Sequence, residues 1–457
     1  MCLENRITEG SIWRPLLTFF FPILLGTFFQ QLYNTVDAII VGNFVGKAAL
    51  AAVGGPTAVL INFLVNLFVG LSSGATVIVA QYYGAGRVDE VRRTVHTSVA
   101  LALAAGVAVM VVGILLSQPL LAAMGTPSEV MDYALTYLRI YFLGSIASFL
   151  YNVGSSILRA VGDSKRPLYF LIAACFTNIV LDLLFVVVLG LKVFGVALAT
   201  VLSQVVAAVL VLIVLCHPGS IFFLRWREVR FHKDILKSVV RIGLPTGLQS
   251  DMYTLSNILI QSCINSFGTD TVAAWTALSK LDAFYWMASG AMGVALTTFV
   301  GQNFGAQKYH RVRRGTLVGG GMLLGITLFC SAVFCGFSYP LLRIFTKDAA
   351  VLAIGSQMVW MMAPFYCTFV LIEICSATIR GTGDSIKPML LTCGGVCVLR
   401  VVWIFTVLPF HKTLGTLLLS YPITWVLTSF LFLIYYKRGN WMRRQIAKYG
   451  FPPEGET

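Results

Sequence analysis

The feature that most constrains this chain is the recurrence of apolar stretches about 20 residues long. Each is long enough to cross a hydrocarbon core of about 30 Å as a helix. Of the 457 residues, 58% are hydrophobic and only 11% are charged, whereas an average soluble domain has about 25% charged residues. We therefore exclude a soluble globule and predict an all-α integral membrane protein. Twelve spans are expected, at about 15–41, 50–83, 94–117, 133–157, 167–190, 194–216, 238–266, 271–303, 315–338, 355–379, 388–408 and 414–436.

The basic residues are unevenly distributed along the chain. The net charge of +14 comes mainly from the N-terminal tail, every second connection and the C-terminal tail. This is the distribution of the positive-inside rule, so nucleic acid is not needed to explain the charge. We predict a multi-pass protein of the plasma membrane with both termini in the cytoplasm. The opening residues lack an apolar core followed by a cleavage site, so the first span is expected to remain in the mature protein.

Two sequence motifs recur at a constant offset. LRAVGDSKRP (158–167) matches IRGTGDSIKP (379–388), and YYGAGRVDEVRR (82–93) matches NFGAQKYHRVRR (303–314). Six spans per half bring both halves into the membrane from the same side, which predicts parallel repeats related by an axis along the membrane normal. We expect two six-helix lobes around a central cleft. The predicted parts are an N-terminal lobe (1–216), a cytoplasmic amphipathic linker that lies on the surface as a helix (217–237), a C-terminal lobe (238–436) and a basic tail of the same kind (437–457).

The first half carries polar residues inside its apolar spans. A carboxylate at the centre of a spanning helix costs roughly 2.5–3.5 kcal/mol, so an intramembrane acid suggests a function. Asn178 and Asp182 share a helix face, and Gln30 and Asn34 are expected on the face of Asp37. Five residues are predicted to lie at similar depths in the outer half of the membrane, and we group them as one candidate site: Asp37, Tyr137, Asn178, Asp182 and Thr200.

These oxygen-rich groups suit a proton or a hard monovalent cation such as Na⁺. The alternative is a structural pair of acids neutralised by Arg139. A metal ion other than Na⁺ at Asp37, Asn178 and Asp182 is not expected, because the histidines and cysteines lack ligand spacing.

The second half has a different set of intramembrane charges, nearer the midplane or the inner half. We interpret them as a substrate site or a second charge site, formed by Asp251, Lys280, Asp282, Trp286, Glu373 and Arg400. Trp275, Trp286, Met287 and Met292 could line an adaptable apolar pocket, although such residues more often merely pack against lipid or core.

Motifs of enzymes and nucleotide-driven pumps are not convincing here. GNFVGKAA (42–49) resembles a phosphate loop, but its glycine spacing is short and Ala48 replaces the required hydroxyl. GLSSG (70–74) fits the nucleophile-elbow pattern but sits within a span, where close helix packing is the better interpretation. We expect neither an enzyme nor a cofactor, and an ion gradient remains as the energy source.

Taken together, NTVDAIIVG (34–42), RAVGDS and RGTGDS, NIVLD (178–182) and TTFVGQNFGA (297–306) resemble the multidrug and toxic compound extrusion (MATE) transporters. The resemblance covers essentially the whole chain. It implies two six-helix lobes with a central cleft, which exchange extracellular H⁺ or Na⁺ for small organic, often cationic, compounds by alternating access. The family's cation site carries over to Asp37, Tyr137, Asn178, Asp182 and Thr200.

One branch of the family uses acids on spans seven and ten in the second lobe, and Asp251 and Glu373 are displaced from that pattern. The protein is expected to work as a monomer. A lipid-carrier or polysaccharide-precursor flippase of the same broad superfamily is the alternative, although it should favour several cationic residues in its cleft. A passive channel is a third alternative.

Overall fold

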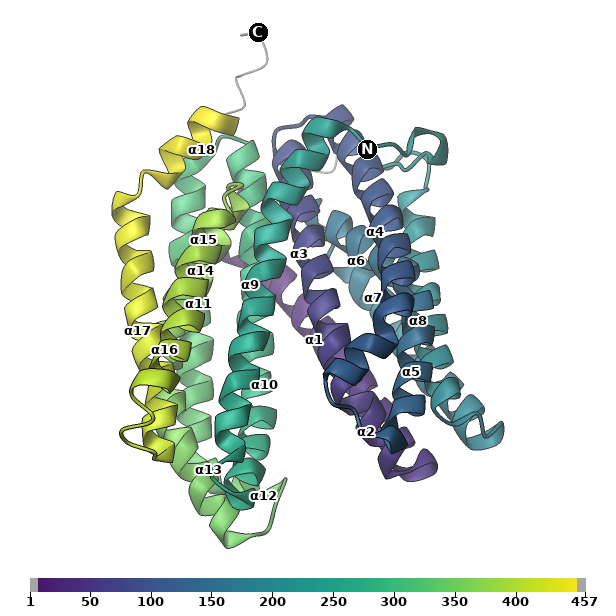
Figure 1. The fold of residues 1–457 in the computed structure, drawn as a ribbon. Helices are drawn as coiled ribbons and strands as arrows, with labels where there is room; N and C mark the ends of the chain where they lie inside the picture. Colours follow the sequence, from purple (N-terminus) through teal and green to yellow (C-terminus); the bar gives the residue numbers. More distant parts are fainter. Residues whose placement is uncertain (1–6, 450–457) are drawn as a thin grey trace. The chain divides into compact units, whose positions relative to one another are not determined.

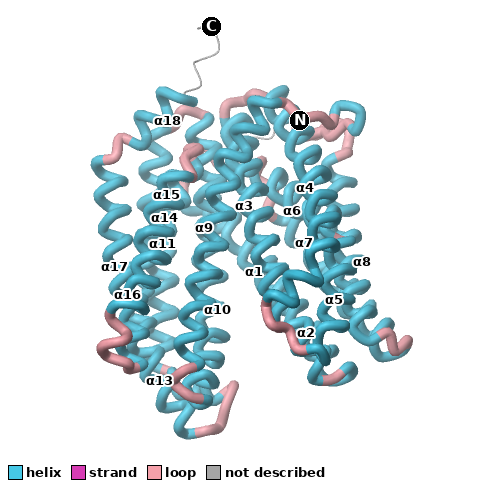
Figure 2. The backbone as a smooth tube through the Cα atoms, in the orientation of Figure 1, coloured by secondary structure: helices cyan, strands magenta, loops and turns pink. Residues whose placement is uncertain are grey.

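Helices make up every regular element of residues 7–449, the part of the chain that the computed structural model describes. Short loops join them (Figure 2). Two compact units are present. The first-half unit is Phe21–Gly247, and the second-half unit consists of the described residues before and after that range.

The helices of the first-half unit, in purple to teal in Figure 1, begin within α1 (Trp13–Ile40), which contains Pro22 and continues into a π-helical segment, Val41–Val45. They continue as α2 (Lys47–Gly54), α3 (Pro56–Gly84), α4 (Val88–Ala123), α5 (Ser128–Leu143), α6 (Ser145–Ala160), α7 (Lys165–Asp182), a second π-helical segment (Leu183–Val188) and α8 (Lys192–Leu215). A loop then leads through a short 3-10 turn (Trp226–Glu228) to α9 (Lys233–Asn265).

The second-half unit continues from within α9, in green to yellow. Its helices are α10 (Thr269–Gly305), α11 (Tyr309–Gly336), α12 (Ser338–Arg343), α13 (Ala349–Met362), a 3-10 turn (Ala363–Phe365), α14 (Tyr366–Gly381), α15 (Ile386–Thr392), a π-helical segment (Cys393–Val398), α16 (Leu399–Thr406), α17 (Leu414–Arg438) and α18 (Trp441–Tyr449).

The structure confirms the predicted all-α membrane fold. Within the described residues, ten helical segments are long and apolar enough to cross a membrane, and α5 with α6 forms an eleventh, bent by 50°. The twelfth expected span is α9, which has 33 residues but is not apolar enough to be counted with the others. Polar residues such as Ser250, Asp251 and Asn257 account for its lower hydropathy.

The compact units differ from the predicted lobes in two segments. Residues up to Phe20 belong with the second half, and the beginning of α9, as far as Gly247, belongs with the first half. Helices α1 and α9 therefore each contribute residues to both units. A boundary drawn where one apolar span ends does not reveal this exchange, because it depends on packing between segments distant in the sequence.

The linker prediction is wrong over most of its length. Instead of a surface helix across 217–237, the chain forms turns and one 3-10 turn before α9 begins at Lys233. Phe222 and Leu224 are buried in the apolar core of the first-half unit, and the backbone amides of Arg225 and His232 bond to side chains of α4. A continuous helix would use those amides internally. The described part of the tail, by contrast, contains a helix, α18, as predicted.

The repeated GDS motif forms the same corner in each half. Gly162 and Gly383 have φ values of 107° and 98°, a left-handed region that favours glycine. The following aspartates then accept backbone N–H groups at the start of the next helix: Asp163 from Arg166 at 3.1 Å, and Asp384 from Lys387 at 3.3 Å. The recurrence at a constant offset therefore has a local structural cause.

Small residues let two helices of the first-half unit approach at backbone distance. A Cβ on Gly70 or Gly74 of α3 would overlap the backbone of α9 at Gly247 and Val239. The glycines of the GLSSG stretch thus pack against another helix, as expected of glycines within a span. The nucleophile-elbow alternative has no strand or turn to support it, since α3 is a continuous helix here.

Candidate functional site: a buried acidic cluster

Both acids of the predicted cation site lie next to π-helical segments. Asp37 is in the last turn of α1, just before Val41–Val45, and Asp182 ends α7, just before Leu183–Val188. The two segments contact each other, and both contact α8. Single π-helical turns inside helices occur frequently at functional sites. Ile40, Val41, Val186 and Val196, next to the acids or on α8, belong to one buried apolar cluster that also includes Tyr137.

Four helices supply the polar side chains of the cluster, each as a pair four residues apart and therefore on one helix face. The pairs are Tyr33 and Asp37 on α1, Tyr137 and Tyr141 on α5, Asn178 and Asp182 on α7, and Thr200 and Gln204 on α8. Asn178, Asp182 and Thr200 have no exposed surface, and Asp37 is 4% exposed. Water therefore has little access to the acids.

The carboxyl group of Asp37 is the centre of the cluster. It interacts with the side chains of Asp182, Asn178 and Thr200. The side chains of Tyr33 and Tyr137 interact with Thr200 and with the Asp37 charge, and Tyr141 interacts with Gln204. The rings of Tyr137 and Tyr141 stack with 6.3 Å between their centroids.

Several polar atoms of the cluster lack a hydrogen bond of ordinary geometry despite being buried. They are Oδ1 of Asp37, both carboxylate oxygens of Asp182, both amide atoms of Asn178 and Oε1 of Gln204. The Thr200 hydroxyl donates to the Val196 carbonyl at 2.9 Å and so offers lone pairs to the cluster. Buried polar atoms are nearly always bonded, so this concentration of unsatisfied oxygens requires an explanation.

A neutralising arginine does not provide that explanation. Arg139 is exposed, and none of the ion pairs found in residues 7–449 involves it, Asp37 or Asp182. Two carboxyl groups close together without a base favour the uptake of a positive charge, either a proton or a small cation. The arrangement can therefore exchange such a charge, and it offers nothing resembling a nucleophile with its base.

The five residues predicted from the first half come together in the structure. Gln30 and Asn34, expected on the face of Asp37, are exposed. The sequence prediction also missed Tyr33, Tyr141 and Gln204. The signal that could have found them is spacing, because each lies four residues from a predicted site residue.

The structure brings some of the residues predicted from the second half together: Asp282 and Arg400 both interact with Tyr421, and Glu373 and Arg400 both interact with Tyr253. Lys280 is exposed, whereas Asp251, Asp282 and Arg400 are buried. Asp282 accepts a hydrogen bond from the Tyr366 hydroxyl, and the guanidinium of Arg400 lies 3.9 Å from the centre of the Tyr421 ring. The Glu373 carboxylate packs on Gly293, where a Cβ would overlap it.

An aromatic cluster surrounds Asp282. Tyr285 and Tyr366 stack with 4.5 Å between ring centroids, and Trp286 meets Phe369 edge-on at 4.8 Å. Trp275 lies 6.1 Å from Tyr421, and Met292 is fully buried. The burial of Met292 favours its packing interpretation, whereas Trp275 and Trp286 stay half-buried among these rings.

Within residues 7–449, no group of three or more His, Cys, Asp or Glu side chains is arranged to hold a metal ion. The oxygen atoms at Asp37, Asn178 and Asp182 are suited to Na⁺ by ligand type alone.

Comparison with known proteins places this arrangement. The sequence profile of the MatE family matches residues 22–184 and 245–406, one stretch in each half. The probable multidrug resistance protein YoeA of Bacillus subtilis is 28% identical over 464 residues, covering 98% of both chains. The probable multidrug resistance protein NorM of Thermotoga maritima is 26% identical over 448 residues, covering 95% of this chain and 94% of that protein.

A solved structure described as the outward-facing conformation of a multidrug resistance MATE family transporter has the same fold. It superposes with a TM-score of 0.88 at 24% identity, covering 98% of this chain and 99% of the other. The fold is therefore that of a multi-span membrane transporter. The chain belongs to the MatE family, and the two relatives above are named probable multidrug resistance proteins.

Proposed function

We propose that this protein is a secondary active exporter, which couples inward movement of H⁺ or Na⁺ to outward movement of small organic, often cationic, compounds. It acts as a transporter and not as an enzyme, and it needs no cofactor. The observation that carries the proposal is the pair of buried acids, Asp37 and Asp182, with unsatisfied oxygens and no basic partner. The names of the relatives support multidrug substrates.

The coupling step follows from the position of the acids at the ends of α1 and α7. A proton or cation bound between Asp37 and Asp182 removes the repulsion between the two carboxylates. The ends of α1 and α7, together with Thr200 of α8, then all contact the same bound charge. Such a charge can shift a conformational equilibrium only by binding one state more tightly than the other. We propose that inward-open and outward-open states differ in how these three helices pack around the acids.

For Na⁺, the ligands would be the carboxylates of Asp37 and Asp182 and the amide oxygen of Asn178, with Thr200 and Tyr137 completing the polar surround. Substrate binding is proposed for the second half, where Asp282 and Trp286 lie in the aromatic cluster and Asp251, Glu373 and Arg400 add charge. Lys280 is exposed and is the weakest member of that set.

Membership of a multi-span transporter family implies a plasma-membrane location. We further propose that both termini are cytoplasmic, that the functional lobes correspond to 1–216 and 238–436, and that the protein works as a monomer. The relatives with multidrug names do not favour the flippase alternative.

The decisive experiment measures efflux of a cationic dye from proteoliposomes under separately imposed pH and Na⁺ gradients. Asp37→Asn and Asp182→Asn should each lower gradient-driven efflux to background, because the amide cannot take up the coupling charge. The gradient that drives the wild-type protein identifies the ion.

Asp132→Asn is the matched control. Asp132 is an exposed acid of α5 in the same unit, so the same charge change should leave efflux intact. Undiminished gradient-driven efflux by Asp37→Asn or Asp182→Asn would show that the acidic pair is not the coupling site.

A further inference from the structure

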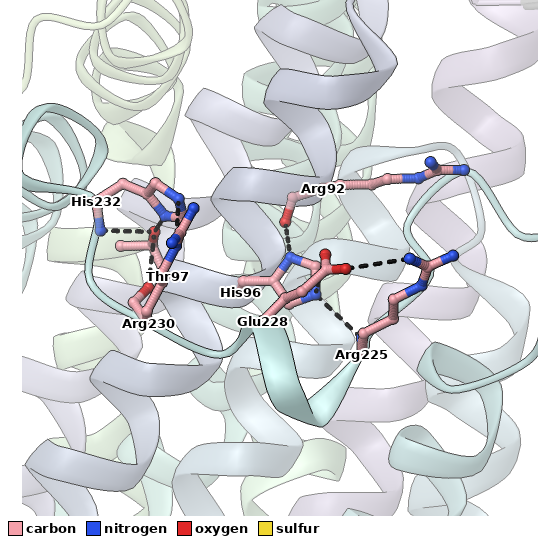
Figure 3. A network of polar contacts seen from close by, with 7 residues as sticks. All are labelled: Arg92, His96, Thr97, Arg225, Glu228, Arg230 and His232. Carbon is pink, nitrogen blue, oxygen red and sulfur yellow. Dashed lines mark hydrogen bonds and ion pairs between the residues drawn. The ribbon is translucent and has the colours of Figure 1, made fainter.

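The linker between the two halves is attached to α4 by two histidines, shown with their partners in Figure 3. All of these residues belong to the first-half unit. The Nδ1–H of His96 donates to the Arg92 carbonyl at 2.7 Å, and its Nε2 accepts the backbone N–H of Arg225 at 3.0 Å. His96 is only 2% exposed. A ring that donates at one nitrogen and accepts at the other is uncharged.

His232 has the same protonation pattern on the linker itself. Its Nε2 accepts from Nε of Arg230 at 3.3 Å, so its Nδ1 carries the hydrogen and donates to the Thr97 hydroxyl oxygen at 2.9 Å. The backbone N–H of His232 donates to the same oxygen at 3.3 Å, and the Thr97 hydroxyl donates to the Arg230 carbonyl at 3.5 Å. Every hydrogen-bonding atom of Thr97 and His232 is thus used.

We propose that His96, Thr97, Arg225, Arg230 and His232 form an acid-released clasp, which holds the linker backbone on α4 while both histidines are uncharged and loosens when they become charged. Protonation turns each Nε2 from an acceptor into a donor. The new N–H then faces another donor, which is the Arg225 amide at His96 and the Arg230 guanidinium at His232. At His96 the bond that is lost joins the linker backbone to α4. At His232 it is the linker's own bond from Arg230, and the charged ring then faces Arg230 and Arg93 while its contacts with Thr97 come under strain.

The charged groups around each histidine determine the direction of the effect. His96 faces Arg225, Glu228 and His232, and the Glu228 carboxylate is 3.9 Å from its Nε2. A charged His96 would be drawn to Glu228, but only by exchanging that carboxylate for the Arg225 amide. Glu228 already pairs with the Arg225 side chain at 3.1 Å. Glu228 belongs to the linker too, so this exchange keeps a side-chain contact with α4 but frees the backbone amide of Arg225.

His232 lies outside the membrane spans and faces Arg230 and Arg93, with Glu90 as the opposing acid. Burial, and then the two arginines, lower the pKa of His232 below its ordinary value. Because the folded pKa is lowered, the clasp has its full strength above the unperturbed pKa of about 6.5 and weakens as pH falls below it.

The second-half unit contains a corresponding attachment without histidine. There Arg311 donates to the carbonyls of Ile7, Glu9 and Gly10 at 2.8–3.2 Å, and Lys308 donates to that of Thr8 at 3.0 Å. The segment before α1 is thus held by groups that stay charged between pH 5 and 8. Of the two attachments, only the one on the linker responds to acid in that range.

Amide hydrogen exchange on the purified full-length chain tests the clasp directly, with neither gradient nor substrate, so its outcome is independent of the proposed transport function. The backbone amides of Arg225 and His232 donate hydrogen bonds within the clasp, so their exchange reports on it directly. Exchange is expressed as a protection factor, because this ratio cancels the effect of pH on the intrinsic exchange rate. Between pH 7.5 and pH 5.0 both protection factors should fall at least about tenfold, which corresponds to about 1.4 kcal/mol of lost opening energy.

Leu224 serves as the control within the same linker, because its amide bonds to the Leu215 carbonyl and its side chain is buried. Its protection should not change. The double variant His96→Asn with His232→Asn keeps a side-chain donor but cannot become charged, so protection at Arg225 and His232 should be weaker and equal at both pH values. Unchanged wild-type protection at pH 5.0, or a wild-type-like fall in the double variant, overturns the proposal.

Discussion

At the scale of single residues, the acidic pair should destabilise the protein when it carries no bound charge. Both carboxylate oxygens of Asp182 are buried without hydrogen bonds, and an unsatisfied buried polar group costs about 1–3 kcal/mol, more when charged. Asp182→Asn keeps the shape and removes the charge. We expect its apparent melting temperature in detergent to exceed that of the wild-type protein by several degrees at alkaline pH in the absence of Na⁺, where the acidic pair has lost its bound proton.

The exposed Asp132→Asn should leave the melting temperature unchanged in the same assay. A lower melting temperature for Asp182→Asn would mean that the carboxylate has a stabilising partner in the folded protein. The melting temperatures thus test, independently of transport, whether Asp182 lacks a basic partner.

The sequence identified the acids because a carboxylate within an apolar span is rare, owing to the free-energy cost of burying it in the membrane. It was not informative about Tyr33 and Tyr141, because tyrosine in a membrane helix usually packs against neighbours and gives no such signal. Helix periodicity places Asn34 one turn from Asp37, but it does not predict that Asn34 is exposed while Asp37 is buried.

At the scale of helices, the contact between α3 and α9 depends on having no side chain at its glycines. A Cβ at Gly70 would overlap the backbone at Gly247, and neither backbone can move like the end of a side chain. We therefore expect Gly70→Ala to destabilise the protein by more than about 2 kcal/mol, visible as a drop in melting temperature and in yield of folded protein.

Gly321→Ala in α11 is the matched control, since nothing lies within 4 Å of a Cβ there. Alanine is a better helix former than glycine by about 1 kcal/mol, so this variant should be neutral or slightly stabilising. If both substitutions behaved alike, helix propensity and not close packing would determine the response at Gly70.

The structure of the linker could not be predicted from its local sequence pattern. Its mixture of aromatic and basic residues is typical of a surface helix, and the sequence of α18 satisfied the same expectation. What the pattern lacks is information on where backbone amides bond, and in the linker those of Arg225 and His232 bond to His96 and Thr97. The composition of a segment gives no information on hydrogen bonds to residues more than 100 positions away in the sequence.

At the scale of the whole molecule, the sequence predicted the fold class because span length and the two recurring motifs act through the entire chain. It did not predict that α1 and α9 each contribute to both compact units. Span counting places the helices in order along the chain, whereas membership of a unit depends on which distant helices pack together.

The parallel repeats predicted from the sequence lead to a topological prediction. An even number of spans separates residues offset by one repeat, so Asp89 and His310, exposed residues at the starts of α4 and α11, should lie on the same side of the membrane. In a background of low cysteine reactivity, Asp89→Cys and His310→Cys should both react with a membrane-impermeant thiol reagent only when it reaches the cytoplasmic side. Glu129→Cys, at an exposed position one span after Asp89, should react only from outside. Labelling of Asp89→Cys and His310→Cys from opposite sides would mean inverted repeats, and then equivalent corners of the two halves could not share one face of the membrane.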